Sequence, residues 1–177
     1  MRLRQLLETF PGKFVVTHRS FVLRPEVNED AHFAEYHLQH RTRAKEMTGL
    51  PYALPQIGSP YPSSSWNALI ASKYIARAHA DKFECFDAEL FRAFFEHSEN
   101  IADLQVLKLL AQECGIDAAE IDRGLADDAT KQEVRRDHNE AQKMGIRGIP
   151  AVIFGHEVIS GAVPLDDYVA AAKRLLS

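Results

Sequence analysis

The chain has 177 residues, a net charge of −4, a hydrophobic fraction of 46% and a charged fraction of 26%. These values are ordinary for a globular protein that builds its own core, and they indicate one domain or one domain with an insertion. The sequence holds no dense basic stripe and no apolar run of about 18 residues, which argues against nucleic-acid and membrane partners. Its N-terminus is too charged for a signal peptide, and two cysteines do not make a disulfide framework, so we expect a cytoplasmic protein.

The first part of the chain alternates between helical and extended patterns. Residues 1–10 carry apolar residues at helical spacing and predict a helix, which a Pro-Gly pair ends. Residues 13–23 are rich in Phe and Val and predict a strand. A helical pattern follows over about 28–47, with Asn28 as its N-cap. Four prolines within residues 49–62 predict a long loop.

The second part of the chain is helical until its last thirty or so residues. Apolar stripes at helical spacing cover residues 66–144 and predict several helices in succession. The hydrophobic period then changes to two, and residues 151–154 and 157–160 predict two short strands joined by a Gly-His turn. Residues 165–176 predict a closing helix with a proline in its first turn.

The tripeptide Gly148-Ile149-Pro150 comes directly before the first of these strands. A proline suits the first residue of a strand, so the tripeptide could be a plain strand entry. In the alternative, the Ile149–Pro150 bond is cis and presents the backbone before it to an extended substrate. X–Pro bonds are cis in only about 5–6% of folded cases, which makes this a sharp prediction. The polar helix and glycine before the tripeptide and the hairpin after it favour the cis form.

Four stretches of the sequence are more specific together than any of them alone. They are Arg19-Ser20-Phe21-Val22-Leu23-Arg24-Pro25; Phe94-Phe95 through Asn100-Ile101, continued by Val106-Leu107 and Leu110-Ala111; Gly145 to Phe154; and Ser160-Gly161-Ala162-x-Pro164. In this order and spacing they resemble the DsbA-like thioredoxin family and, within it, the cytoplasmic FrnE-type branch, in which a proline stands where this chain has Ser20.

The resemblance implies an α/β, thioredoxin-like fold with an all-helical insertion. Residues 1–62 and 127–177 would form the thioredoxin-like domain, and residues 63–126 the insertion. It also implies a thiol–disulfide oxidoreductase that acts on a protein or small-thiol substrate, with glutathione as one candidate. Gly148, Ile149 and Pro150 would bind that substrate.

The sequence departs from this family at its N-terminus. Family members begin with a strand and a Cys-x-x-Cys pair on the first turn of a helix, whereas Met1 falls where that helix is already under way. Exchange of disulfides needs a thiolate nucleophile, which a helix N-terminus stabilises. We therefore assign no catalytic residue and expect no dithiol–disulfide exchange from the chain as written. Either the start is an internal methionine, which we favour because it falls inside an element, or the protein is a redox-inactive relative. A sheet without its first strand also makes a homo-oligomer one expected outcome.

The cysteines and histidines have plainer interpretations. Cys85 lies among phenylalanines and Cys114 on an apolar helical stripe, so we expect both to be buried structural residues, and nothing in the sequence indicates that they meet. Of the eight histidines, His32, His37 and His40 share a predicted helix, where we expect them to be solvated. Their spacing is not that of a metal site, and we expect neither a metal nor a cofactor.

The aromatic and basic residues around the proline loop leave alternatives open. Tyr52 and Tyr61 could line a peptide groove or cap the edge of a core. Arg41, Arg43 and Lys45 are expected to form a solvated helical face.

Two other functions stay open. One is that of the glutathione-linked kappa transferase and hydroxychromene carboxylate isomerase group, which shares the architecture and uses a serine at the N-terminal helix. The stretch at residues 160–164 fits the FrnE-type branch better. The other is a redox-inactive peptide-binding module that uses the loop at Pro150 and the loop carrying Tyr52 and Tyr61.

Overall fold

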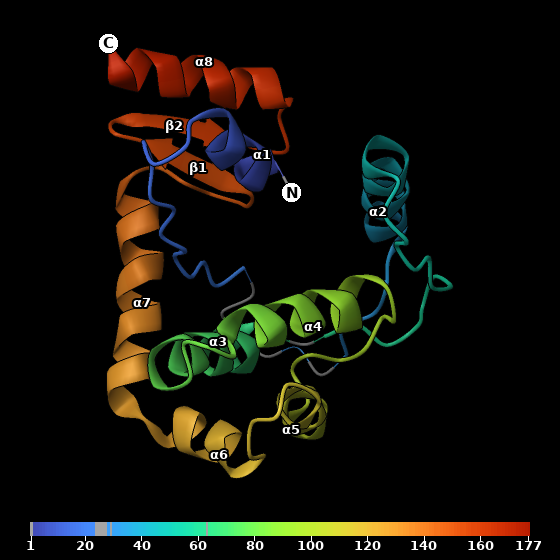
Figure 1. The fold of residues 1–177 in the computed structure, drawn as a ribbon. Helices are drawn as coiled ribbons and strands as arrows, with labels where there is room; N and C mark the ends of the chain where they lie inside the picture. Colours follow the sequence, from blue (N-terminus) through green and yellow to red (C-terminus); the bar gives the residue numbers. More distant parts are fainter. Residues whose placement is uncertain (1, 24–27, 29, 63) are drawn as a thin grey trace. The chain divides into compact units, whose positions relative to one another are not determined.

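The computed structural model describes residues 2–23, 28, 30–62 and 64–177 (Figure 1). The chain divides into two compact units, Met1–Phe21 with Arg136–Ser177, and Val22–Arg135. Helix α7 (Asp128–Lys143) crosses the boundary between the two units, which lies between residues 135 and 136.

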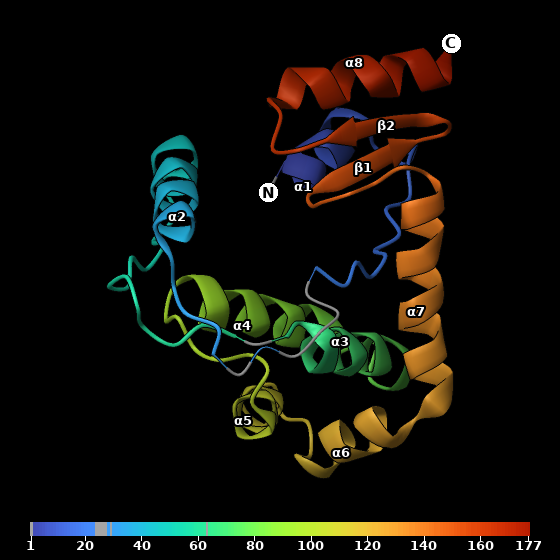
Figure 2. The ribbon, with the colours of Figure 1, turned by 180° about the vertical axis from the view of Figure 1, so that it is seen from behind.

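The first unit packs two helices against a β-hairpin. Strand β1 (Ala151–Phe154) pairs antiparallel with β2 (Glu157–Ser160), and Figure 2 shows the hairpin with α1 (Arg2–Thr9) and α8 (Leu165–Leu176). The two strands and α8 begin and end at the predicted residues, so these predictions are confirmed. Their shared core consists of Leu6, Phe154, Tyr168, Ala171 and Ala172.

The hairpin turn requires a glycine. Gly155 has a φ of +60°, in the left-handed region that favours glycine. A Cβ added to it would lie 2.9 Å from Leu175 Cδ1 of α8. The turn and the helix are therefore in close contact.

The predicted strand over residues 13–23 is wrong, because the described residues there form no strand. Their polar groups are held by α7 instead: Asp137 accepts from Arg19 Nη1 at 2.8 Å and from the Ser20 N–H at 3.1 Å. The Phe21 ring lies edge-on to His138, with ring centroids 4.9 Å apart. Residues with strand propensity form a strand only where a neighbouring edge takes up their backbone hydrogen bonds. Within the described ranges, β1 and β2 make the one sheet.

The second unit is helical. It contains α2 (Glu35–Thr48), α3 (Trp66–Ala78), α4 (Phe83–Phe95), α5 (Leu104–Glu113), α6 (Ala119–Ala126) and the first part of α7. The helix predicted from Asn28 begins later, at Glu35, and Asn28 Oδ1 accepts from the Asp30 N–H instead. Residues 31–33 lie against the proline loop, with the Phe33 N–H donating to Ser59 O at 2.7 Å.

The core of the second unit lies between α3, α4, α5 and α6. Ile75, Phe86, Leu107 and Ile121 are fully buried there, because the apolar stripes of the four helices face one another. Helices α3 and α6 come close at Gly124, where an added Cβ would lie 2.8 Å from Tyr74 Cγ.

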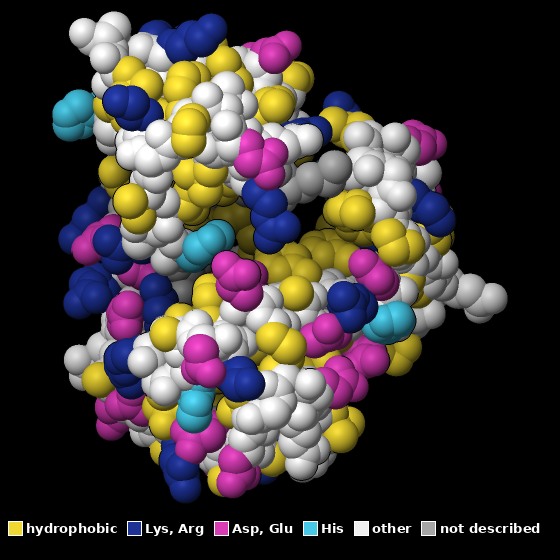
Figure 3. All heavy atoms as spheres, in the orientation of Figure 1, with side chains coloured by type: hydrophobic (Ala, Val, Ile, Leu, Met, Phe, Trp, Pro, Cys, Tyr) yellow, Lys and Arg dark blue, Asp and Glu magenta, His cyan; other side chains and the backbone are white. Residues whose placement is uncertain are grey.

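Two further properties bear on the expected partners. None of the helices in the described ranges is long and apolar enough to cross a membrane. On the face drawn in Figure 3, acidic and basic side chains are interspersed over the helical unit.

The two compact units differ from the predicted domains, because residues 22–62 belong to the helical unit, whereas the sequence assigns them to the thioredoxin-like domain. The predicted domain boundaries, which rest on chain topology, stay a prediction.

Candidate functional site

The loop before β1 has the backbone geometry predicted for it. The Ile149–Pro150 peptide bond is cis. Ile149 is 57% exposed, although Ile146, three residues earlier, is buried and anchors the loop. A Cβ added to Gly148 would meet no atom within 4 Å, so the space over this residue is open.

The backbone of this loop is only partly used within the chain. Pro150 O accepts from the Gly161 N–H at 2.8 Å, which ties the loop to the segment after β2. The N–H and C=O of Ile149 make no hydrogen bond with the part of the chain that the structure describes. An exposed, unpaired peptide group beside a strand can receive an extended polypeptide through main-chain hydrogen bonds. The structure thus brings Gly148, Ile149 and Pro150 together as one open surface.

A pocket in the helical unit is the second candidate. It has a volume of about 220 Å³ and is lined by His37, His40, Arg41, Ala44, Tyr52, Tyr61 and Phe95. Both loop tyrosines therefore reach a cavity. Their rings also pack, Tyr52 against Phe95 and Tyr61 against Phe33, so they contribute to the edge of the core as well.

Arg41, one of the residues that line this pocket, is buried with 6% of its surface exposed, so the predicted solvated face is wrong for this residue. Its Nη1 donates to Ala53 O at 3.1 Å and to Ser98 Oγ at 2.9 Å, and its Nη2 donates to Phe94 O at 2.9 Å. Its guanidinium also lies 4.9 Å from the centroid of the Phe94 ring. Burial lowers the pKa of Arg41, and the tyrosines Tyr61 and Tyr52 oppose that shift.

These contacts give Arg41 a positioning role. Its acceptors are neutral oxygens, one of them near the C-terminal end of α4, where the helix dipole is negative. The acceptors are Ala53 in the proline loop, Phe94 at the end of α4 and Ser98 just after it. The Arg41 side chain therefore ties α2 to the proline loop and to the end of α4. Arg43 and Lys45 are exposed, as predicted.

His37 is also more buried than predicted. Its Nδ1 accepts from the Ala34 N–H at 2.9 Å, and its ring stacks on Tyr61 with centroids 4.1 Å apart. His32 and His40 are exposed. The described residues contain no group of three or more His, Cys, Asp or Glu that could hold a metal ion.

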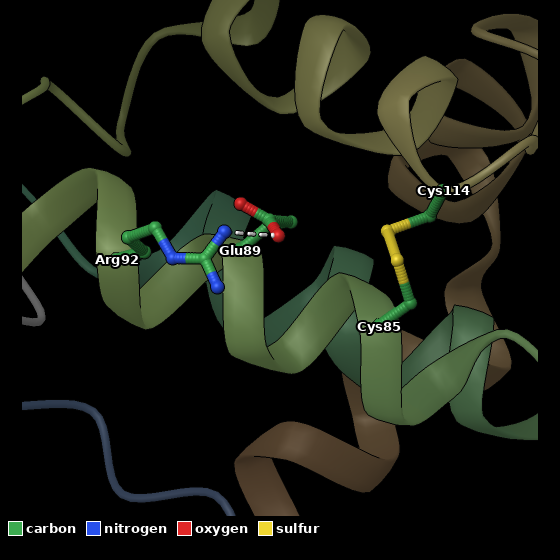
Figure 4. The surroundings of a disulfide bond; sticks show 4 residues. All are labelled: Cys85, Glu89, Arg92 and Cys114. Carbon is green, nitrogen blue, oxygen red and sulfur yellow. Dashed lines mark hydrogen bonds and ion pairs between the residues drawn. A yellow bond between two sulfur atoms is a disulfide. The ribbon is translucent and has the colours of Figure 1, made fainter.

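The two cysteines form a disulfide, a pairing that nothing in the sequence indicates (Figure 4). Cys85 lies in the first turn of α4 and Cys114 caps the end of α5, with 5.8 Å between their Cα atoms. Cys114 is buried, as predicted, but Cys85 is exposed. The pair could not be recognised in the sequence, because the cysteines are 29 positions apart and only helix packing brings them together.

Comparisons with known proteins agree on family and fold. The family model described as a DSBA-like thioredoxin domain matches residues 1–173. The uncharacterized protein YwbO of Bacillus subtilis (strain 168) is 28% identical over 131 residues, which are 71% of this chain and 62% of the relative. The chain thus matches less than two thirds of that relative's length.

Solved structures extend the likeness over almost the whole chain. A probable DsbA oxidoreductase from Streptomyces coelicolor has a TM-score of 0.80 at 25% identity, over 99% of this chain and 82% of the other. A putative protein disulfide isomerase from Nitrosomonas europaea has a TM-score of 0.71 at 23% identity, over 99% and 86%. A 2-hydroxychromene-2-carboxylate isomerase has a TM-score of 0.70 at 18% identity, over 99% and 87%. The predicted α/β, thioredoxin-like fold with an all-helical insertion is confirmed.

Proposed function

Because the chain belongs to the DSBA-like thioredoxin domain family, we propose that it acts in thiol–disulfide exchange on a protein or small-thiol substrate. In this proposal Gly148, Ile149 and Pro150 bind the substrate. The observation that carries it is Ile149, a residue that is exposed and whose peptide group makes no hydrogen bond with any described residue. An extended polypeptide would donate to and accept from this group, and its side chains would occupy the open space over Gly148.

The finer assignment is to the cytoplasmic FrnE-type branch. It is supported by the stretch at residues 160–164, whose Gly161 N–H holds the carbonyl of Pro150 and so positions the loop. The mixed surface charge and the net charge of −4 support protein or thiol substrates over nucleic acid or membranes. A homo-oligomer would form at the edge of β1 that pairs with no described strand, because an edge strand offers unpaired backbone groups.

A redox-inactive, peptide-binding module is the second candidate. It is favoured by one observation, the absence of a Cys-x-x-Cys pair from the 177 residues. Binding at the Ile149 backbone needs no thiol, so the loop would work equally well in such a protein. The likeness to the isomerase at 18% identity concerns the fold alone.

The binding proposal is tested by filling the space over Gly148. We expect the protein to bind a fluorescein-labelled, unfolded and S-alkylated polypeptide, followed by fluorescence anisotropy. Gly148→Trp should weaken this binding at least tenfold, because its side chain enters open space without a left-handed backbone to strain. His156→Trp is the matched control, since it places the same side chain at the turn between the strands, and it should bind as the wild type does.

Two outcomes would overturn the assignment of the loop. Equal affinities for the wild type and Gly148→Trp would show that the polypeptide binds elsewhere. Binding of glutathione without binding of the polypeptide would favour the kappa transferase and isomerase group instead.

A further inference from the structure

The disulfide between Cys85 and Cys114 is unequally exposed. Cys85 is open to solvent, whereas Cys114 is 6% exposed and belongs to the apolar core that also contains Leu107 and Phe86. These residue exposures favour attack by an external thiol at Cys85 over attack at Cys114. Exposed disulfides are the ones that exchange readily, while enclosed ones are inert.

The two sulfurs also differ in their position on the helices. Cys85 is the third residue of α4, where the unpaired N–H groups of the first turn favour a negative thiolate. Cys114 caps the C-terminal end of α5, where the dipole has the opposite sign and the apolar core disfavours a charge. On reduction, the negative charge is therefore better accommodated on Cys85 than on Cys114.

The charged side chains around the bond are mixed. Lys82, the N-cap of α4, approaches the residue after Cys114, since a Cβ on Gly115 would lie 3.9 Å from the Lys82 Nζ. Glu84 neighbours Cys85 in sequence, and Glu89 lies one turn further along α4. The Glu89 carboxylate is paired with Arg92 at 2.6 Å, as Figure 4 shows, which reduces its repulsion of a thiolate.

We propose that Cys85 and Cys114 form a dithiol–disulfide redox centre in the helical unit, with Cys85 as the nucleophile and Cys114 as the resolving cysteine. This centre goes beyond the substrate-binding loop proposed above and does not depend on it. It also replaces the expectation that the chain as written has no exchange activity, because one of its cysteines has the exposure and helix position that a reactive thiolate needs.

The exchange needs only Cys85, Cys114 and a substrate dithiol, and every bond and electron is accounted for among them. A substrate thiolate attacks Cys85 Sγ, a substrate–Cys85 disulfide forms, and the bond to Cys114 breaks so that Cys114 Sγ leaves and takes up a proton. The second substrate thiolate then attacks the substrate sulfur and releases Cys85 as a thiolate. The substrate becomes a disulfide, and its two electrons reside on the two protein thiols. In reverse, the reduced pair reduces a substrate disulfide.

The helical unit can hold both redox states. Helices α4 and α5 share a core in which Phe86, Leu107 and Ala111 are buried beside Cys114, so their packing also rests on apolar contacts other than the disulfide. Reduction should therefore open the bond without separating the helices. In a reducing cytoplasm the pair would stand open until a disulfide-bearing partner oxidises it.

The first test measures the reactivity of the two thiols in the full chain. The protein is reduced, freed of reductant, and labelled at pH 7 with limiting iodoacetamide, and the labelled cysteines are counted by peptide mass spectrometry. We expect Cys85 to react at least tenfold faster than Cys114 while the circular dichroism stays that of the oxidised form. Equal rates, faster labelling of Cys114, or loss of the helical signal on reduction would each overturn the proposal. Iodoacetamide needs no polypeptide site, so this result is separate from the fate of the loop assignment.

The second test measures exchange itself, as reduction of insulin by dithiothreitol. We expect the wild type to accelerate insulin reduction several-fold over the variant with both Cys85→Ser and Cys114→Ser. Cys85→Ser alone should abolish the acceleration, whereas Cys114→Ser should accumulate a mixed disulfide through Cys85. A wild-type rate equal to that of the double variant, or a mixed disulfide that forms through Cys114, would rule the centre out.

Discussion

At the scale of single residues, two buried charges each hold a loop in place. Arg41 in the helical unit donates to oxygens of the proline loop and of the end of α4. Asp137 in the first unit has a fully buried carboxylate, which accepts from Arg19 and from the Ser20 N–H. A buried charge persists only where hydrogen bonds compensate its lost hydration. Both residues therefore fix irregular segments that have no strand or helix of their own.

Replacing Arg41 by methionine should destabilise the helical unit. Arg41→Met keeps the length of the side chain but leaves the carbonyls of Ala53 and Phe94 without their donor. We expect a loss of about 2–4 kcal/mol in the free energy of unfolding, measured by urea titration with circular dichroism. Arg43→Met, at an exposed position of the same helix, should change it by less than about 0.5 kcal/mol. Equal midpoints for the two variants would show that the Arg41 contacts contribute nothing.

The sequence could not distinguish these two arginines. They lie two residues apart on one helix, and the groups that surround Arg41 come from residues 53 and 94–98. The same limit applies to Cys85 and Cys114, whose pairing follows from the packing of α4 on α5. At the Gly148–Pro150 loop the sequence was sufficient to locate the candidate site, because the Gly-Ile-Pro pattern and the strand after it are local.

At the scale of elements, the junction of α6 and α7 depends on one carboxylate. Asp127 is the C-cap of α6. Its side chain accepts two hydrogen bonds from the start of α7, one from the Ala129 N–H at 3.2 Å and one from the Thr130 hydroxyl at 2.6 Å. It is also paired with Arg77 of α3. The Thr130 hydroxyl first, and then Arg77, lower the pKa of Asp127 to about 2.

This shift predicts a loss of stability on acidification. The pKa of Asp127 is lower in the folded state than in the unfolded state. The contribution of its carboxylate to the free energy of unfolding is therefore fully present above the ordinary aspartate pKa of about 3.9, and it is lost as the pH falls through about 2. The difference in unfolding free energy between the wild type and Asp127→Asn should therefore shrink over this range. Thr130→Val, which removes the largest cause of the shift, should move the loss toward higher pH. Urea titrations at several pH values measure this, and parallel pH profiles of the wild type and Asp127→Asn would contradict it.

The elements that the sequence predicted well are those with local signals. The two strands of the hairpin carry an alternating pattern with a glycine at their turn, and α8 has a proline before it. Both strands and α8 begin and end at the predicted residues. Residues 13–23 have the composition of a strand but pair with no strand among the described residues, and composition does not reveal whether a partner strand is present. The late start of α2 has the same kind of cause, because residues 31–33 are held by the proline loop.

At the scale of the whole molecule, the helical unit is continuous in sequence and the other unit is not. Residues 22–135 contain two apolar clusters of their own, one around Phe86 and one around Ile70 and Val134. The sequence places the boundaries of the insertion elsewhere, at residues 63 and 126. The two divisions imply different smallest fragments that fold independently.

We expect a fragment of residues 22–143, which keeps α7 whole, to unfold cooperatively in urea. A fragment of residues 63–126 should not, because it lacks Val22 and Val134 of the second cluster and the Arg41 contacts to the end of α4. Circular dichroism and the sharpness of the urea transition distinguish the two fragments. A cooperative transition for residues 63–126 with none for residues 22–143 would favour the boundaries predicted from the sequence.

The core of the first unit joins the two ends of the chain, since Leu6 of α1 packs with Tyr168 and Ala172 of α8. During translation α1 leaves the ribosome about 160 residues before α8, a delay on the order of 10–30 s at about 5–20 residues per second. The helical unit can fold in that interval, while α1 waits with Leu6 uncovered. The newborn chain therefore carries α1 with the apolar side chain of Leu6 exposed to water until α8 is synthesised and covers it.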